Sequence, residues 1–316
     1  MKLLIIHLGY PKAASTFLQK KVFSKLKGYE YLSDSKKYKD LYRLKRKVFY
    51  TKPSDTLVKN NYIQDFSSKL NKIINNSKEE KFIFSSEAIL NFYRFNGELN
   101  LISLVEIIKN LQENTNIKIK LLSIVRRQDE MLHSIFTYSY DVFRGSYNDI
   151  NSFINDFGSP NFNSLFKNLD YSKIDKYFMK NNSIKIDFLL LEHLKFNPKE
   201  FMRDINRLIE NTSNIDDISI EIINSNSMMH KKVMNSKNFY LMSDLHHRLK
   251  KFQIYRILIP ARLTNLIKTN NFLNPKVFSE IDEESVGLIL REYKEGNMSL
   301  AKNNNFEDQI IKYKYI

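Results

Sequence analysis

Cysteine and tryptophan are absent from this sequence, and glycine and proline are scarce. The chain of 316 residues has no Cys or Trp, with 7 Gly and 6 Pro. Without cysteine there is no disulfide, thiolate metal site or cysteine nucleophile, so a reducing compartment, the cytoplasm, is the expected setting. The low Gly and Pro content excludes fibrous and low-complexity classes, and we expect an ordered, compact chain.

Long apolar segments are also missing. The apolar start at Leu3 to Ile6 is too short for a signal peptide and is soon followed by Gly9 and Pro11. No later stretch reaches the roughly 18 consecutive apolar residues that a membrane-spanning helix needs. The sequence therefore predicts no transmembrane segment.

Acidic residues are outnumbered by basic ones. The chain has 50 Lys and Arg against 35 Asp and Glu, a formal net charge of +15. Such a surface attracts phosphate, sulfate and carboxylate groups, although lysines that only keep the chain soluble would produce the same total. Charge alone does not decide between these interpretations.

Short apolar runs alternate with helical patterns through the first two thirds of the chain. The runs bounded by polar residues are Lys2 to His7, Lys81 to Phe84, Ile117 to Val125 and Ile184 to Leu191. Helical periodicity follows from Ser15 to Gly28 and in Tyr62 to Ile74, Leu101 to Leu111, Asp129 to Tyr140 and Pro198 to Ile209. This alternation predicts an α/β fold, a parallel β-sheet flanked by helices.

Beyond about Asn211 the strand pattern fades. Helical patterns run from Met234 to Leu258, where Pro260 interrupts them, and again from Pro275 to Ala301. No repeat or linker separates this part from the rest. We therefore expect a single domain over residues 1–316, in which residues 211–316 form a helical C-terminal extension.

The loop after the first strand has the features of an anion site. It runs from Gly9 through Pro11 and Lys12 to Ser15, and a strand leads through it into a helix. Amide groups at a helix start face outward, small residues let the backbone approach a phosphate, and lysine and hydroxyl groups supply charge and donors. The alternative is that this loop binds no ligand and is a plain turn from strand to helix.

The same loop does not fit a Walker A motif. That motif needs a Gly-Lys-Ser/Thr end, whereas Ala14 and Ser15 stand here and Lys12 lies three residues after Gly9. The strand near Phe84 ends in Ser85-Ser86-Glu87 rather than in a Walker B aspartate. An ordinary ATP- and Mg²⁺-dependent nucleotide kinase is therefore disfavoured, and it stays an alternative.

A second polar segment follows the strand that ends at Val125. Arg126 comes directly after this strand, and Ser134 follows it by 134 − 126 = 8 residues on a predicted helix. One or two helical turns can bring the Ser134 hydroxyl back toward the guanidinium, and the two groups can then clamp one phosphate. A salt-bridged arginine without function is the competing interpretation.

Together the two segments resemble the phosphate sites of the sulfotransferases that use 3'-phosphoadenosine-5'-phosphosulfate (PAPS). In that family the first loop reads Pro-Lys, two small residues, two hydroxyl residues and an aromatic, and an arginine at a strand end has a serine eight residues on. The resemblance implies a P-loop NTPase-like fold, PAPS as co-substrate and no metal. It also implies these PAPS-binding residues: Pro11, Lys12, Ala13, Ala14, Ser15, Thr16, Phe17, Arg126 and Ser134.

The resemblance has two departures and one weaker match. The family usually has Asn-Pro after the arginine, whereas Arg127-Gln128 stands here, so a different turn is expected. Ala14 stands where the family usually has glycine, so the backbone is expected to reach the phosphate without a positive φ. The run Phe188 to Leu194, followed by Pro198, looks like the family strand that leads into a proline-initiated helix. The resemblance covers roughly residues 2 to 210.

Three residues are candidates for the chemistry. Lys12 suits stabilisation of the charge on the transferring group. Glu87 follows a strand at the same sheet edge, where the family places a His or Glu base, and His133 is the reserve base. A Glu87 that only caps the next helix is the alternative.

The acceptor cannot be named from the sequence. We expect a hydroxyl or amine, with a carbohydrate favoured from the basic charge. The segment Tyr38 to Tyr50 could hold an acidic glycan or RNA, or it could be a solvated helix face. A basic nucleic-acid-binding protein is the second alternative, but it leaves the two phosphate segments unexplained, and no nucleic-acid partner is expected.

Overall fold

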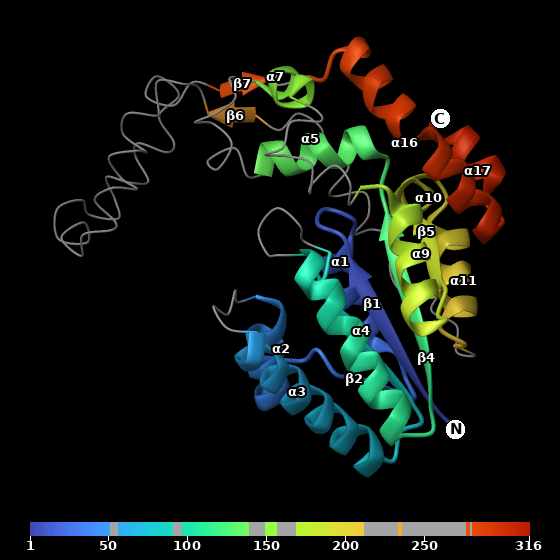
Figure 1. Ribbon diagram of the computed structural model, residues 1–316. Coiled ribbons are helices and arrows are strands. Elements are labelled where there is room, and N and C mark those ends of the chain that lie inside the picture. The colour runs from blue at the N-terminus through green and yellow to red at the C-terminus, as the bar shows by residue number, and fades with distance from the viewer. Residues whose placement is uncertain are drawn as a thin grey trace, which may run out of the picture.

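A computed structural model shows the fold of the chain (Figure 1). It describes residues 1–50, 56–90, 97–138, 149–156, 169–211, 233–235, 276–278 and 280–316. The predicted helical segment from Met234 to Leu258, after its first two residues, lies outside the described residues.

The apolar runs of the first two thirds form one parallel sheet. Its strands are β1 (Lys2–Gly9), β2 (Tyr29–Tyr31), β3 (Lys81–Ser86), β4 (Ile117–Val125) and β5 (Ile186–Leu190), in the order β2-β3-β1-β4-β5. The central β1 is buried from Leu3 to Gly9, as expected for a strand covered on both faces. The predicted α/β class is confirmed. β2 was not predicted, because three half-buried residues carry no readable periodicity.

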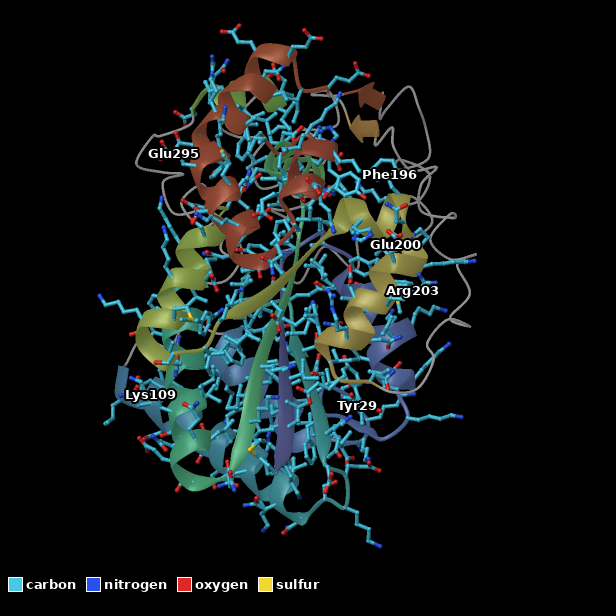
Figure 2. The ribbon with its side chains drawn as sticks, turned by 90° about the vertical axis from the view of Figure 1, so that its right-hand side faces the viewer. Tyr29, Lys109, Phe196, Glu200, Arg203 and Glu295 are labelled. Carbon is cyan, nitrogen blue, oxygen red and sulfur yellow. The ribbon has the colours of Figure 1, made fainter. Side chains whose placement is uncertain are left out.

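Helices cover both faces of this sheet. They are α2 (Lys39–Phe49), α3 (Thr56–Asn76), α4 (Gly97–Asn114), α9 (Tyr171–Asn182), α10 (Leu191–Phe196) and α11 (Pro198–Leu208). Two more helices, α5 (Gln128–Tyr138) and α7 (Ile150–Asn155), lie beyond the carboxyl ends of the strands (Figure 1). In Figure 2 the sheet is seen from its side, with Lys109 of α4 on one face and Glu200 and Arg203 of α11 on the other. Tyr29 lies near the end of α11, and its hydroxyl donates to the Ile209 carbonyl at 2.6 Å.

The helix predicted to begin at Ser15 is irregular. It consists of a short α1 (Ser15–Phe17), a π-helical turn η1 (Leu18–Val22) and a 3₁₀ turn η2 (Phe23–Lys25). Turns of π-helix are uncommon and occur frequently at functional sites. The apolar spacing predicted the helical segment but not its change of pitch.

The C-terminal part contains helices and a small hairpin. The helices are α16 (Glu283–Asn304) and α17 (Glu307–Lys312), and β6 (Val233–Asn235) pairs antiparallel with β7 (Lys276–Phe278). The prediction that a helix begins at Met234 and that another begins at Pro275 is wrong at these strands. Their partners lie about forty residues apart in the sequence, so local periodicity cannot predict the pairing.

Helix α16 packs against α5 through buried amides. The side chains of Gln128 and Asn297 exchange two hydrogen bonds, of 2.8 and 3.1 Å, and Asn297 also donates to the Tyr315 carbonyl at 2.9 Å. Gly296 lets α16 approach closely, because a Cβ there would lie 2.6 Å from an Asp170 carboxylate oxygen. These contacts agree with the single-domain interpretation, which stays a prediction.

The strand order positions the candidate site. The chain leaves β1 toward β2 on one side and leaves β4 toward β5 on the other. Because parallel crossovers are right-handed, the segments after these two adjacent strands diverge to opposite faces. Ligands of open α/β sheets bind at such a point, outside the carboxyl ends of the strands.

Candidate active site at the ends of β1, β3 and β4

Three of the predicted site segments follow neighbouring strands. Leu8 of β1 pairs with Ser86 of β3, and Gly9 pairs with Ile124 of β4. The loop after Gly9, the residue Glu87 and the residue Arg126 therefore begin at the same edge of the sheet, on strands about 4.8 Å apart. Figure 1 shows β1 ending at α1 on the side of the sheet where α5 lies.

The backbone of the first loop forms an anion-binding arrangement. Lys12 has φ 64° and Ala14 has φ 57°, whereas Ala13 between them has no positive φ. Alternating φ signs are the backbone pattern of anion-binding nests, and here the Ala13 amide donates to the Tyr10 carbonyl at 3.4 Å. The expectation that Ala14 would avoid a positive φ is wrong. The loop adopts the glycine-like conformation without glycine.

Side chains hold this loop in place. Ser15 is buried, and its hydroxyl donates to the Tyr10 carbonyl at 3.2 Å. Gly9 permits the close approach of β3, because a Cβ there would lie 2.9 Å from Ser15 Oγ and 3.0 Å from Glu87 Cα. Thr16 is exposed at the start of α1, where no side chain caps the helix.

The remaining residues of the predicted loop differ in burial. Pro11 and Ala13 are buried, while Lys12 and Phe17 are half-buried. Leu18 closes the first helical hydrogen bond by donating its amide to the Ala14 carbonyl at 3.0 Å.

Glu87 lies beside the loop. Its Cγ would be 3.1 Å from a Cβ on Gly9, and its Oε1 accepts a weak hydrogen bond from Thr16 Oγ1 at 3.4 Å. Residues 87–90 form a turn, and α4 begins only at Gly97. The alternative in which Glu87 caps the next helix is therefore wrong.

A buried hydrogen-bond network lies beneath Glu87. Ser85 Oγ is 2.8 Å from His7 Nδ1 and accepts from Gln19 Nε2 at 2.9 Å. The Ser85 oxygen has two acceptor lone pairs, so a neutral His7 can either accept from this hydroxyl or donate to it. Burial lowers the pKa of His7 to about 3. The network joins β1, β3 and η1 below the site.

Arg126 ends β4 inside a cluster of charges. Its Nε and Nη2 donate to Glu130 Oε2 at 3.1 and 2.8 Å, and Lys195 Nζ reaches the same oxygen at 2.7 Å. Burial alone would raise the Glu130 pKa, but the charges of Arg126 and Lys195 bring it to about 2. Lys195 Nζ also lies 3.8 Å from Glu192 Oε1, so the cluster of two cations and two carboxylates has a formal net charge of 2 − 2 = 0.

Ser134 shares a helix face with this cluster. It lies four residues after Glu130 on α5, so the two side chains project from the same side of the helix. The structure gives no contact between Ser134 and Arg126, and both Ser134 and His133 are half-buried. The predicted serine-arginine clamp is thus not closed within the described residues.

Tyr171 links the two phosphate segments and was missed by sequence reasoning. Its ring packs edge-on against Tyr10 with centroids 4.9 Å apart, and its hydroxyl donates to the Arg126 carbonyl at 2.6 Å. Glu130 and Lys195 were missed as well. The spacing of Arg126 and Glu130, four residues apart across a helix start, could have predicted their ion pair.

The segment Tyr38 to Tyr50 is more than a solvated face. It forms α2, in which Arg43 and Arg46 are exposed, but Lys45 is 6% exposed. The interpretation of this segment as a purely solvated face is therefore wrong at Lys45.

Metal-ligating clusters and membrane-spanning helices are both absent from the described residues. No group of three or more metal-ligating His, Cys, Asp or Glu side chains occurs among them. Within the same residues, no helix is long and apolar enough to cross a membrane.

Comparison with known proteins gives matches to solved structures. No family model and no curated sequence matches the chain. A sulfotransferase from Alicyclobacillus acidocaldarius is similar at 14% identity and a TM-score of 0.42, with 84% of this chain and 96% of that chain covered. The sulfotransferase domain of the Synechococcus PCC 7002 olefin synthase is similar at 12% identity and a TM-score of 0.35, with 73% and 84% covered. Both of these proteins are sulfotransferases.

Proposed function

We propose that this chain is a sulfotransferase that moves the sulfuryl group of PAPS to an acceptor hydroxyl or amine, with a carbohydrate as the favoured acceptor. The observation that carries the proposal is the pair of anion sites at the ends of β1 and β4. PAPS carries a phosphate at the 3' position of its ribose and a phosphosulfate at the 5' position. Two separated anion sites at one sheet edge would therefore suit it.

Each site has a defined part in donor binding. The nest at Lys12 to Ala14, with the hydroxyls of Ser15 and Thr16, would hold the 5'-phosphosulfate. Arg126 and Ser134 would hold the 3'-phosphate, and Lys195 would add a second cation. Arg126 and Lys195 would each give the phosphate a charge-assisted hydrogen bond in place of their present contacts with Glu130.

The proposed reaction is a direct displacement at sulfur. The acceptor oxygen attacks the sulfur atom while Glu87 takes the acceptor's proton. The bond from sulfur to the bridging oxygen of the 5'-phosphosulfate breaks, and adenosine 3',5'-bisphosphate leaves with the electron pair of that bond. Lys12 and the nest amides stabilise the charge that develops on the leaving phosphate. His133 is the second candidate for the base.

Ligand-induced thermal stabilisation tests the donor assignment. Adenosine 3',5'-bisphosphate at a hundredfold excess over its Kd should add about 2.7 kcal/mol, which raises the melting temperature by several degrees. ATP with Mg²⁺, and NAD, should give much smaller shifts. Stabilisation by ATP with Mg²⁺ and not by the bisphosphate would support a nucleotide kinase. Binding of RNA with a steep salt dependence and no bisphosphate shift would support a nucleic-acid-binding protein.

Two substitutions then separate binding from chemistry. Arg126→Ala should remove most of the bisphosphate shift, whereas Arg203→Ala, an exposed arginine on α11 (Figure 2), should leave the shift unchanged. Lys12→Ala should lower turnover by roughly 10² to 10³, with less effect on bisphosphate affinity. An unchanged shift in Arg126→Ala refutes the assignment of the 3'-phosphate site.

A further inference from the structure

Lys45 is a buried cation on α2 near the candidate base. The residue is 6% exposed, and its Nζ lies 4.5 Å from the centroid of the Tyr42 ring and 6.0 Å from that of Tyr50. Among the described residues, no carboxylate or hydrogen-bond acceptor is in contact with this ammonium group. The Tyr42 and Tyr50 rings and the nearby Glu87 offset only part of the cost of burying this charge, because the pKa of Lys45 is still lowered.

The position of Lys45 relative to Glu87 is fixed by the fold. Asn100 is buried, and its Nδ2 donates to the Phe49 carbonyl at 3.0 Å and to the Ala88 carbonyl at 2.7 Å. One amide thus ties the end of α2 to the turn that carries Glu87. The side chains of Tyr50 and Ser86 are also hydrogen-bonded to each other. Helix α2 and the end of β3 therefore form one unit.

The ammonium group stays largely charged at neutral pH. Burial lowers the pKa of Lys45 to about 8, and the nearby Glu87 acts in the opposite direction. Tyr42, whose ring centroid lies 4.5 Å from Lys45 Nζ, is 36% exposed. A cation held under an exposed aromatic ring, close to a proton acceptor, is suited to binding an anionic substrate group.

We propose that Lys45 and Tyr42 form the acceptor subsite, and that the acceptor is an acidic saccharide. A carboxylate or ester anion on the acceptor would pair with Lys45, and the sugar ring would lie against Tyr42. The hydroxyl to be sulfated would then face Glu87. This inference rests on the proposed sulfuryl transfer and narrows its acceptor to one chemical class.

Binding of two matched probes tests the subsite. p-Nitrophenyl β-glucuronide and p-nitrophenyl β-glucoside differ in a carboxylate against a hydroxymethyl group. Calorimetric titration of the protein saturated with adenosine 3',5'-bisphosphate should show the glucuronide bound about tenfold more tightly, the difference expected for one charge-assisted contact. Lys45→Met should abolish this preference. Arg43→Met, an exposed residue of the same helix, should retain it.

The stability of the variant separates a binding role from a structural one. Lys45→Met removes a buried charge and keeps the chain length, so its melting temperature should equal or exceed that of the wild type. Lys45→Gln serves as a second neutral variant. Equal binding of the two probes by the wild type, or a glucuronide preference that survives in both variants, overturns the subsite. The bisphosphate shift is measured separately, so loss of the probe preference with an intact shift leaves the sulfotransferase proposal standing.

Discussion

Glu87 is the residue on which the proposed chemistry depends most. Glu87→Gln keeps the side-chain size and can still accept the Thr16 hydrogen bond, but the amide cannot take a proton. Turnover with labelled PAPS and a saccharide acceptor should fall by roughly 10² to 10⁴ while the bisphosphate shift stays intact.

Glu79→Gln is the control for this change, because Glu79 is exposed and lies just before the start of β3, at the opposite end from Glu87. It should leave turnover unaltered. A wild-type rate in Glu87→Gln would exclude Glu87 as the base, and His133 would be substituted next.

Ala14 has a strained backbone conformation in the first loop, with φ 57°. A non-glycine residue in the left-handed region is disfavoured by about 1–2 kcal/mol, a cost that glycine would remove. Glycine also gives the unfolded chain more conformational freedom, which lowers the stability of the folded chain by about 0.4–1 kcal/mol. Ala14→Gly should therefore be neutral or raise the unfolding free energy by up to about 1 kcal/mol, measured by urea denaturation.

The opposite sign is expected where alanine is helical. Ala301→Gly, inside α16, should lower the unfolding free energy by about 1 kcal/mol or more. Ala14→Val should also destabilise, because a β-branched residue tolerates a positive φ poorly. If Ala14→Gly destabilises as much as Ala301→Gly does, the left-handed conformation of the loop is refuted.

At the scale of elements, the docking of α16 on α5 supports the second anion site. Asn297→Ala removes the partner of Gln128 Oε1 and of the Tyr315 carbonyl, while Gln128 Nε2 keeps its bond to the Leu169 carbonyl at 3.3 Å. The unfolding free energy should fall by about 1–3 kcal/mol. Gln128 begins α5 and lies two residues after Arg126, so the bisphosphate shift should also shrink.

Asn304→Ala is the matched control for Asn297→Ala. Asn304 lies at the end of the same helix and donates its side-chain amide only one turn back, to the Leu300 carbonyl at 2.9 Å. It should change neither quantity by much. Equal effects of the two variants would show that the α5 contact has no special part in donor binding.

At the scale of the whole molecule, His7 makes the fold sensitive to acid. Its pKa falls from an ordinary value of 6.5 to about 3 in the folded chain. Between these values the unfolded chain binds more protons than the folded one, so stability is present above pH 6.5 and is lost as the pH falls. The loss approaches roughly 1 kcal/mol for each pH unit below 6.5.

His7→Gln should reveal this contribution. The variant should be less stable than the wild type at neutral pH, because the contact with Ser85 is altered. Its unfolding free energy, measured by urea denaturation between pH 7 and 5, should decline less steeply than that of the wild type. Parallel slopes would mean that His7 does not titrate in this range on unfolding.

The sequence by itself determined four strands of the parallel sheet and the loops that follow β1 and β4. Buried strands such as β1 and β4 have continuous apolar runs, and the loop residues that follow them are polar. Parallel strands present their carboxyl ends at one edge, so residues about a hundred positions apart could be predicted to share a site. Lys12, Glu87 and Arg126 follow adjacent strands for this reason.

Tertiary structure alone decided the state of the charged groups and of the loop backbone. Three features arise from segments far apart in the sequence. They are the positive φ of Ala14, the burial of Lys45, and the ion pairs of Glu130 with both Arg126 and Lys195. Hydrophobic periodicity reports which face of an element is buried, but it does not report which distant side chains meet there. Packing between α2 and β3, and between β4 and α10, decided those contacts.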